Sequence, residues 1–262
     1  MQDSAESINC ELLKLYQSKE EIFSQIYQRK DVLNLNLMLP YVCKNFVESK
    51  AKLMVIGQET YGWVFEGNRE KTMEHTMEFL SHNKDKNSYF WYFIKQFYET
   101  LGEELGNDFT PIVWNNVRKV CFNLPKHKGK PKPKDPLPQE LQEFINNNLG
   151  NLLFEEIKII QPKIALFLTG PNFEKYIKPQ LHGIEHHSIK DFLALNPTLK
   201  QEEFPLPNKL KKVKVLTHKD LPNTLMLRIY HPTYYHYQLE KNRSQYFESL
   251  TKLCKKWLDI QS

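Results

Sequence analysis

Residues 52–57, Lys-Leu-Met-Val-Ile-Gly, form a short apolar run that follows charged residues and ends at a glycine. A run of this length with β-branched side chains is typical of a buried strand rather than a helix. Residues 164–170, Ile-Ala-Leu-Phe-Leu-Thr-Gly, predict a second strand of the same kind. Further strands are predicted at residues 110–120, 212–217 and 224–230.

Helices are predicted between these strands, because apolar residues recur there at helical spacing. The predicted helices cover residues 6–28, 88–102, 139–160 and 246–258, with a short helix after Pro171 and an irregular region at 180–210. Strands that alternate with helices predict an α/β/α fold around a mostly parallel sheet. No linker plainly separates two folding units. We expect an N-terminal helical extension, residues 1–48, packed on a core domain, residues 49–262.

The chain has 262 residues, and 36 Lys and Arg against 31 Asp and Glu give a formal net charge of +5. This mildly basic balance is compatible with a nucleic-acid partner. The polar, acidic N-terminus lacks the pattern of a signal peptide, and no apolar run is long enough to span a membrane. The cysteines, Cys10, Cys43, Cys121 and Cys254, lie far apart without a C-x-x-C pair. We therefore expect a soluble, cytoplasmic monomer with reduced cysteines and no membrane partner.

Several common enzyme motifs are absent from the sequence. It contains none of G-x-G-x-x-G, G-x-x-x-x-G-K-[ST], G-x-S-x-G, H-E-x-x-H or the zinc-deaminase pattern. Their absence argues against dinucleotide oxidoreductases, P-loop enzymes, common serine hydrolases and zincins. His182, His186 and His187 have no acidic or cysteine partner at ligand spacing, so we expect neither a metal nor another cofactor.

Three predicted strands end in polar residues: Gly57-Gln58-Glu59, Asn115-Asn116 and Tyr230-His231-Pro232. In a parallel sheet, ligand sites form at the edge where the strands have their carboxyl ends. Side chains alternate along a strand, so only one of the two asparagines faces such a site, and we favour Asn116.

These segments together resemble the uracil-DNA glycosylase superfamily. Residues 57–63, Gly-Gln-Glu-Thr-Tyr-Gly-Trp, resemble the family's G-Q-D-P-Y-H motif, and residues 231–234, His-Pro-Thr-Tyr, resemble its H-P-S-P motif. Residues 115–120 are similar to the T-N-V-V-K segment of the thermophile-type branch, and the Pro-rich residues 123–138 follow as its loop does. Order and spacing agree over roughly residues 50–250. The resemblance implies a three-layer α/β/α sandwich around a mostly parallel four-stranded sheet.

The resemblance also implies a reaction. It is the hydrolysis of the N-glycosidic bond of uracil, or of a related damaged base, flipped out of single- or double-stranded DNA in base-excision repair. Breaking this bond leaves positive charge on the sugar and negative charge on the base. Glu59 stands at the position of the family's water-activating Asp, and His231 matches the His that stabilises the departing base. These two residues are the expected catalytic pair.

The other expected roles concern recognition. Asn116 would read the base edge with its carboxamide, and Tyr61 matches a Tyr that excludes the thymine methyl group. Phe90, or a neighbouring aromatic residue within Tyr89–Phe93, would stack on the flipped base, and Gln58 would touch it. The expected DNA contacts are Thr233, Tyr235, Lys128 and Lys130.

The sequence departs from the family pattern at Glu59, which replaces Asp, at Thr60, which replaces Pro, and at Gly62, which replaces His. These departures support an alternative function, that of a catalytically impaired protein that binds nucleic acid or a nucleobase on the same fold. A third possibility is the hydrolysis of a free nucleoside or nucleotide.

Overall fold

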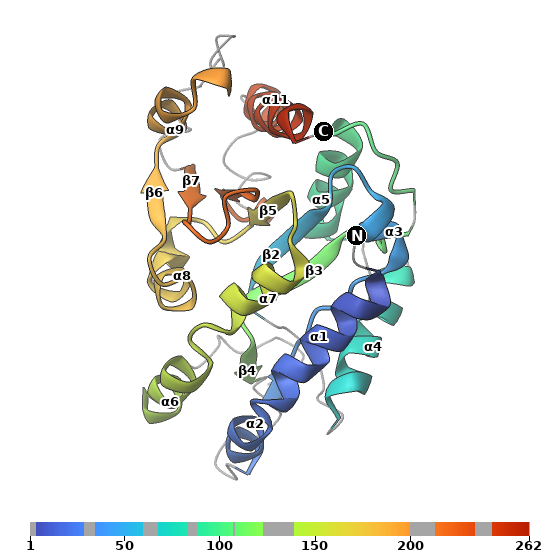
Figure 1. Cartoon of the computed structure of the whole chain (residues 1–262), viewed down its shortest axis with the longest axis vertical. Helices are drawn as coiled ribbons and strands as arrows, with labels where there is room; N and C mark the ends of the chain where they lie inside the picture. The colour runs from blue at the N-terminus through green and yellow to red at the C-terminus, as the bar shows by residue number, and fades with distance from the viewer. Residues whose placement is uncertain are drawn as a thin grey trace, which may run out of the picture.

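The computed structural model of the chain describes residues 4–28, 35–59, 68–82, 88–106, 108–122, 139–199, 213–233 and 243–261. Six strands of this part form the main sheet, and two more form a separate antiparallel pair (Figure 1). The strands of the main sheet, in spatial order, are β3 (Val113–Arg118), β2 (Leu53–Glu59), β5 (Ile164–Phe167), β8 (Leu225–Arg228), β7 (Lys214–Thr217) and β6 (Glu185–His187). The pair consists of β1 (Leu35–Leu37) and β4 (Val120–Phe122).

The four strands β3, β2, β5 and β8 are contiguous and parallel. In contrast, β7 is antiparallel to β8, and β6 is antiparallel to β7. The carboxyl ends of β3, β2, β5 and β8 therefore share one edge of the sheet.

The expectation of a four-stranded, mostly parallel sheet was wrong, because the described part contains a mixed sheet of six strands. The short connection between β7 and β8 allows them to pair as antiparallel neighbours, whereas parallel neighbours need a longer crossover. The strand β6 lies in the region expected to be irregular. Its sequence, Glu-His-His, has no apolar run that would indicate a strand.

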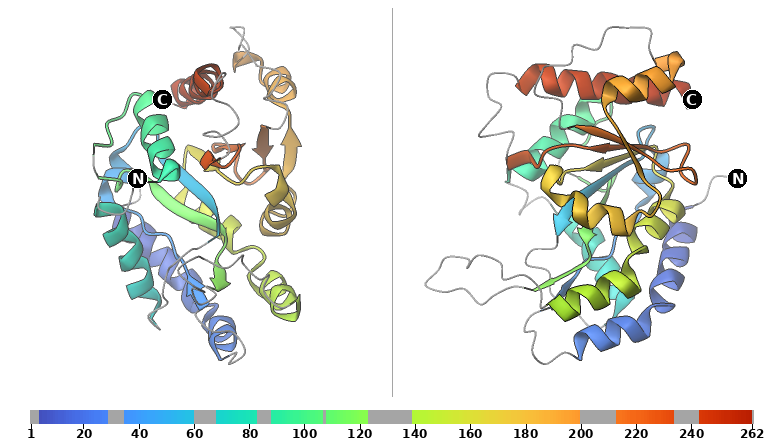
Figure 2. Two further views of the ribbon diagram at one scale, coloured as in Figure 1. Left: turned by 180° about the vertical axis from the view of Figure 1, so that it is seen from behind. Right: turned by 90° about the vertical axis from the view of Figure 1, so that its left-hand side faces the viewer.

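Helices cover both faces of the sheet (Figure 2). Along β2, Leu53 and Val55 face one hydrophobic core, and Met54 and Ile56 face the other, as the alternation of a strand requires. The first core is completed by α5 (Tyr89–Thr100), α9 (Ile189–Leu195), η3 (Pro197–Leu199) and α11 (Arg243–Ile260). The second is completed by α1 (Ala5–Gln17), α2 (Glu20–Tyr27), α3 (Lys44–Glu48), α6 (Gln139–Leu149), α7 (Leu152–Ile160), η2 (Pro171–Phe173) and α8 (Glu174–Gln180). Helix α4 (Arg69–Ser81) contributes to both cores.

Two predicted helices are each divided in the structure. The predicted helix at residues 6–28 is α1 followed by α2, and the one at 139–160 is α6 followed by α7. The second break lies at Gly150, and glycine is unfavourable inside a helix. Within the described residues, no helix is both long and apolar enough to cross a membrane.

Candidate functional site

The predicted site residues that the structure describes lie at the carboxyl edge of the parallel strands. Gln58 and Glu59 end β2, Asn116 lies near the end of β3, and His231 follows β8. The register pairs Gly57 with Asn116, so the ends of β2 and β3 are level.

Asn116 and Asn115 are both buried, and they contact different elements. The Asn116 side chain lies over Gly57, because a Cβ placed on Gly57 would clash with Asn116 Oδ1. Its Nδ2 donates to the Met38 Sδ at 3.0 Å. Asn115 Nδ2 instead donates to Glu156 Oε2 of α7 at 2.9 Å. The absence of a side chain at Gly57 therefore makes room for the carboxamide that we expected to read a base.

His231 and Phe90 form the aromatic part of the site. Their rings are stacked, with 5.9 Å between centroids and 28° between planes. The backbone N–H of Thr233 donates to His231 Nδ1 at 3.3 Å. A neutral imidazole that accepts at Nδ1 carries its proton on Nε2, so His231 can offer Nε2–H to a ligand. Phe90 lies in the first turn of α5 and also packs on Trp114 of β3, which fixes the position of the stack.

Glu59 forms an ion pair that the sequence analysis did not anticipate. Its Oε2 lies 3.1 Å from Nη1 of Arg118, the residue opposite it on β3. The two side chains are 13% and 18% exposed, so solvent reaches the pair only partly. The Arg118 guanidinium also lies 5.3 Å from the ring centre of Tyr176 on α8. The expected catalytic carboxylate is therefore held beside a cation, and only the strand register could have revealed this partner.

Gln58 holds two strands together at the same edge. Its Nε2 donates to the backbone oxygen of Thr169, just after β5, at 2.9 Å. Among the described residues, the buried Thr169 Oγ1 has no hydrogen-bond partner. Gly170 follows with φ +71°, and its N–H donates to the Ile229 oxygen at 2.8 Å. These bonds place the end of β5 between Gln58 and the residues that precede His231.

Some expected site residues lie outside the described residues, namely Tyr61, Tyr235, Lys128 and Lys130. Thr60 and Gly62, two departures from the family motif, lie outside them as well. Thr233 is described and exposed, and it contacts His231 through its backbone as given above.

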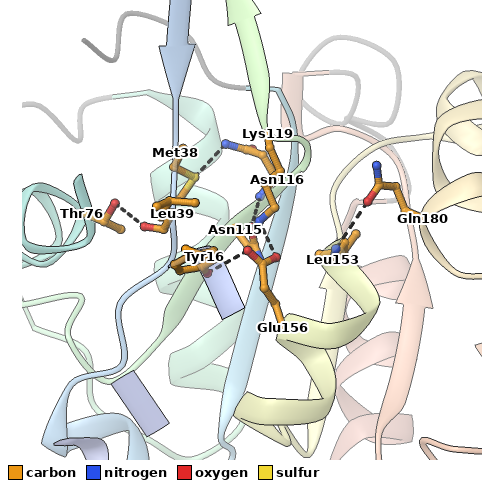
Figure 3. A network of polar contacts seen from close by, with 10 residues as sticks. All are labelled: Tyr16, Met38, Leu39, Thr76, Asn115, Asn116, Lys119, Leu153, Glu156 and Gln180. Carbon is orange, nitrogen blue, oxygen red and sulfur yellow. Dashed lines mark hydrogen bonds and ion pairs between the residues drawn. The ribbon is translucent and has the colours of Figure 1, made fainter. Parts of the chain in front are cut away.

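A buried polar network lies behind the end of β3, and the sequence analysis missed it (Figure 3). Glu156 accepts from the Tyr16 hydroxyl of α1 at 2.8 Å and lies 2.5 Å from Lys119 Nζ. Lys119 Nζ also donates to Asn115 Oδ1. Each of these four side chains is at most 2% exposed. Their partners are distant in the sequence, so local patterns could not have indicated the network.

Burial changes the acid–base behaviour of this network. Burial lowers the pKa of Lys119, and the nearby Glu156 carboxylate opposes that change. Burial and the same carboxylate raise the pKa of Tyr16 well above its usual value. The tyrosine therefore remains a hydrogen-bond donor throughout the ordinary pH range.

Two of the three histidines considered as metal ligands lie beside carboxylates. His186 Nδ1 lies 3.5 Å from Glu174, and His187 Nε2 lies 3.3 Å from Glu185. In the part of the chain that the structure describes, no group of three or more His, Cys, Asp or Glu residues is suited to hold a metal ion. No protein-family model matches this chain, and no curated protein matches it either.

Proposed function

We propose that this protein is a DNA glycosylase that hydrolyses the N-glycosidic bond of uracil, or of a related damaged base, flipped out of DNA. The observation that carries the proposal is the stack of Phe90 on His231 at the strand edge that also holds Asn116. An aromatic face, an imidazole N–H and a carboxamide are groups that bind and read an extruded base.

Each of these groups has a step in the proposed reaction. Asn116 offers both a donor and an acceptor to the base edge, which favours uracil over cytosine. His231 donates through Nε2 to the base as negative charge develops on it. Glu59 faces the positive charge of the sugar and orients the attacking water. Arg118 holds the Glu59 carboxylate in one orientation through their ion pair.

The beginning of α5 supports a nucleic-acid partner. Tyr89 and Tyr92 lie within one turn of Phe90 and are 44% and 52% exposed, which is unusual for large aromatic side chains. Bases on either side of an extruded nucleotide can stack on exposed aromatic rings. The net charge of +5 favours the approach of the DNA phosphates.

The proposal includes the finer features of the family resemblance. The parallel strands β3, β2, β5 and β8 would be the four-stranded core of a uracil-DNA glycosylase-like sandwich, with β7 and β6 as an addition at one side. The protein would act as a cytoplasmic monomer without a metal or other cofactor.

One observation favours a second function, that of a nucleic-acid-binding or nucleobase-binding protein without catalysis. The Glu59 carboxylate is ion-paired with Arg118. A guanidinium at this distance offsets the negative charge that would stabilise a sugar cation. Under this alternative, Phe90, His231 and Asn116 would still bind the base, but the bond would remain intact.

A strand-cleavage assay after alkali treatment tests the two functions. Labelled oligonucleotides with one uracil, hypoxanthine or xanthine are used as single and double strands. We expect cleavage at one of these bases. The excision rate should fall about 100-fold or more when Glu59→Gln and His231→Ala are combined, because both charges in the transition state then lack a partner.

The control combines Glu185→Gln with His182→Ala, which lie outside the site and should leave the rate unchanged. Less than tenfold loss in the combined site variant would refute the assigned catalytic roles. Tight DNA binding by folded protein without cleavage at any base would instead support the binding function.

A further inference from the structure

The backbone of Asn116 is held by the side chain of the residue before it. Asn115 Oδ1 accepts the Asn116 N–H at 2.8 Å. Among the described residues, β3 is at the edge of the main sheet, where alternate backbone groups have no neighbouring strand to bond to. The Asn115 carboxamide satisfies one of these groups, so the orientation of Asn115 fixes the backbone at Asn116.

Asn115 is itself fixed by the buried network (Figure 3). Its Nδ2 donates to Glu156, its Oδ1 accepts from Lys119, and Glu156 is held on its other oxygen by Tyr16. Lys119 and Glu156 carry opposite charges, so the pair brings no net charge close to the site. The hydrogen bonds leave the Asn115 carboxamide one orientation, with its oxygen toward Lys119 and the Asn116 N–H.

The side chain of Asn116 also depends on Lys119. Asn116 Nδ2 donates to Met38 Sδ, and the Met38 N–H donates to the Lys119 backbone oxygen at 3.3 Å. A thioether is a weak acceptor, so a carbonyl oxygen on a bound base can replace it. Both the backbone and the carboxamide of Asn116 are therefore placed relative to Lys119.

We infer that Asn115, Lys119, Glu156 and Tyr16 position Asn116 and thereby set which base the site accepts. This inference rests on the proposed function of the site. A buried ion pair is by itself weak evidence for stability, because apolar residues of similar volume often replace one without loss. The bonds from this pair to Asn115, and from Asn115 to the Asn116 N–H, give it a role in specificity. The four are positioning residues, since they act on the base through Asn116, to which Asn115 is bonded.

The test compares base selectivity, defined as the excision rate for the preferred base divided by that for the other bases. Asn115→Leu keeps the approximate volume but removes the acceptor of the Asn116 N–H. We expect it to lower the selectivity by about tenfold to 100-fold, because a displacement of the Asn116 carboxamide by about 1 Å should lower the excision rate of the preferred base by about that factor.

A swap of the two side chains provides the rescue. Asn115→Asp combined with Glu156→Gln retains one carboxylate beside Lys119, and the introduced amide donates to it. We expect this double variant to recover the selectivity to within about threefold of the original protein, since the carboxylate at position 115 still accepts from Lys119 and from the Asn116 N–H, and the amide oxygen at position 156 still accepts from Tyr16. The contact between Lys119 and position 156 is the one that is lost. Asn115→Asp alone places two carboxylates together and should not recover it.

Tyr98→Phe is the matched control, because it removes another buried hydroxyl, which donates to Ser49 Oγ at 2.9 Å, away from the network. It should leave selectivity unchanged. Tyr16→Phe is the mildest change within the network and should lower selectivity by about threefold. It replaces Asn115→Leu in the test if that variant does not fold.

The outcomes separate the inference from the proposed function. Unchanged selectivity in folded Asn115→Leu, with an active original protein, overturns the inference alone. If the original protein binds DNA without cleaving it, the same ratio is taken from Kd values for the different bases. If it neither cleaves nor distinguishes bases in binding, the proposed function and the inference both fail.

Discussion

Gly57 is the residue that allows Asn116 to lie against the neighbouring strand. In Gly57→Ala, the added methyl group would clash with Asn116 Oδ1, which is the end of a side chain that can rotate away. We expect the free energy of unfolding to change by less than about 1.5 kcal/mol, because one small group must move. The excision rate should fall by about tenfold or more, because the reading group is displaced. Thermal unfolding and single-turnover excision measure the two effects.

Gly102→Ala provides the control for this prediction. Gly102 follows α5 with φ +92°, and a Cβ there meets no described atom within 4 Å. The substitution should cost about 1–2 kcal/mol through backbone strain alone, without changing the excision rate. A Gly57→Ala protein that is strongly destabilised but fully active would contradict the geometry of this contact.

The sequence allowed several site residues to be placed at one edge, because each follows a recognisable apolar run. The placement of Glu59 and Asn116 towards the ends of β2 and β3, and of His231 after β8, was predicted in this way, and their roles stay predictions. The contacts around them could not be found, because Arg118 pairs with Glu59 across two strands and Glu156 is linked to Asn116 only through Asn115. A hydrogen bond between residues 140 positions apart, as between Tyr16 and Glu156, leaves no local pattern in the sequence.

At the scale of the elements, buried strands were predicted well and short polar ones were not. The apolar runs of β2 and β5 are buried along their lengths, so their composition alone identifies them. In contrast, β6 is held by its pairing with β7, and α9 by packing in the first core. Neither has a long apolar pattern, so tertiary contacts decide their conformation.

Helix α5 yields a prediction about binding. Tyr92→Ala removes an exposed ring from the helix that carries Phe90. We expect the affinity for single-stranded DNA to fall by about tenfold, since stacking of a base on an aromatic ring contributes about 1–3 kcal/mol. Fluorescence anisotropy with a labelled oligonucleotide at fixed salt measures the change.

Leu195→Ala is the matched control, because Leu195 is 66% exposed on α9 beside β6, at the other side of the sheet from β3. It should not change the affinity. Equal effects of the two substitutions would mean that exposed apolar area, rather than stacking beside the site, determines binding.

At the scale of the whole molecule, α1 contributes to one face of the sheet, and the three tryptophans of the described residues lie on the other. Leu12 of α1 is fully buried in the second core, whereas Trp91, Trp114 and Trp257 belong to the first. In a single cooperative unit, Leu12→Ala should lower the free energy of unfolding by about 2–5 kcal/mol, because it leaves a cavity. The midpoint of urea unfolding followed by tryptophan fluorescence should shift with it.

Far-UV circular dichroism provides the comparison for this experiment. Coincident transitions by the two probes would mean that both faces unfold together. An unchanged fluorescence midpoint in Leu12→Ala, with an earlier change in circular dichroism, would mean that residues 1–48 unfold as a separate extension. Leu195→Ala should shift neither midpoint, because surface changes of this kind cost less than about 0.5 kcal/mol.

The bond between Tyr16 and Glu156 has a consequence for the synthesis of the protein. The two residues are 140 positions apart, and ribosomes add about 5–20 residues per second, so the acceptor is made about 7–28 s after the donor. During this interval α1 lacks its neighbour α7, whereas its neighbours α3 and α4 are made earlier in the chain. A growing chain arrested before α7 is complete therefore exposes to chaperones the part of α1 that packs on α7.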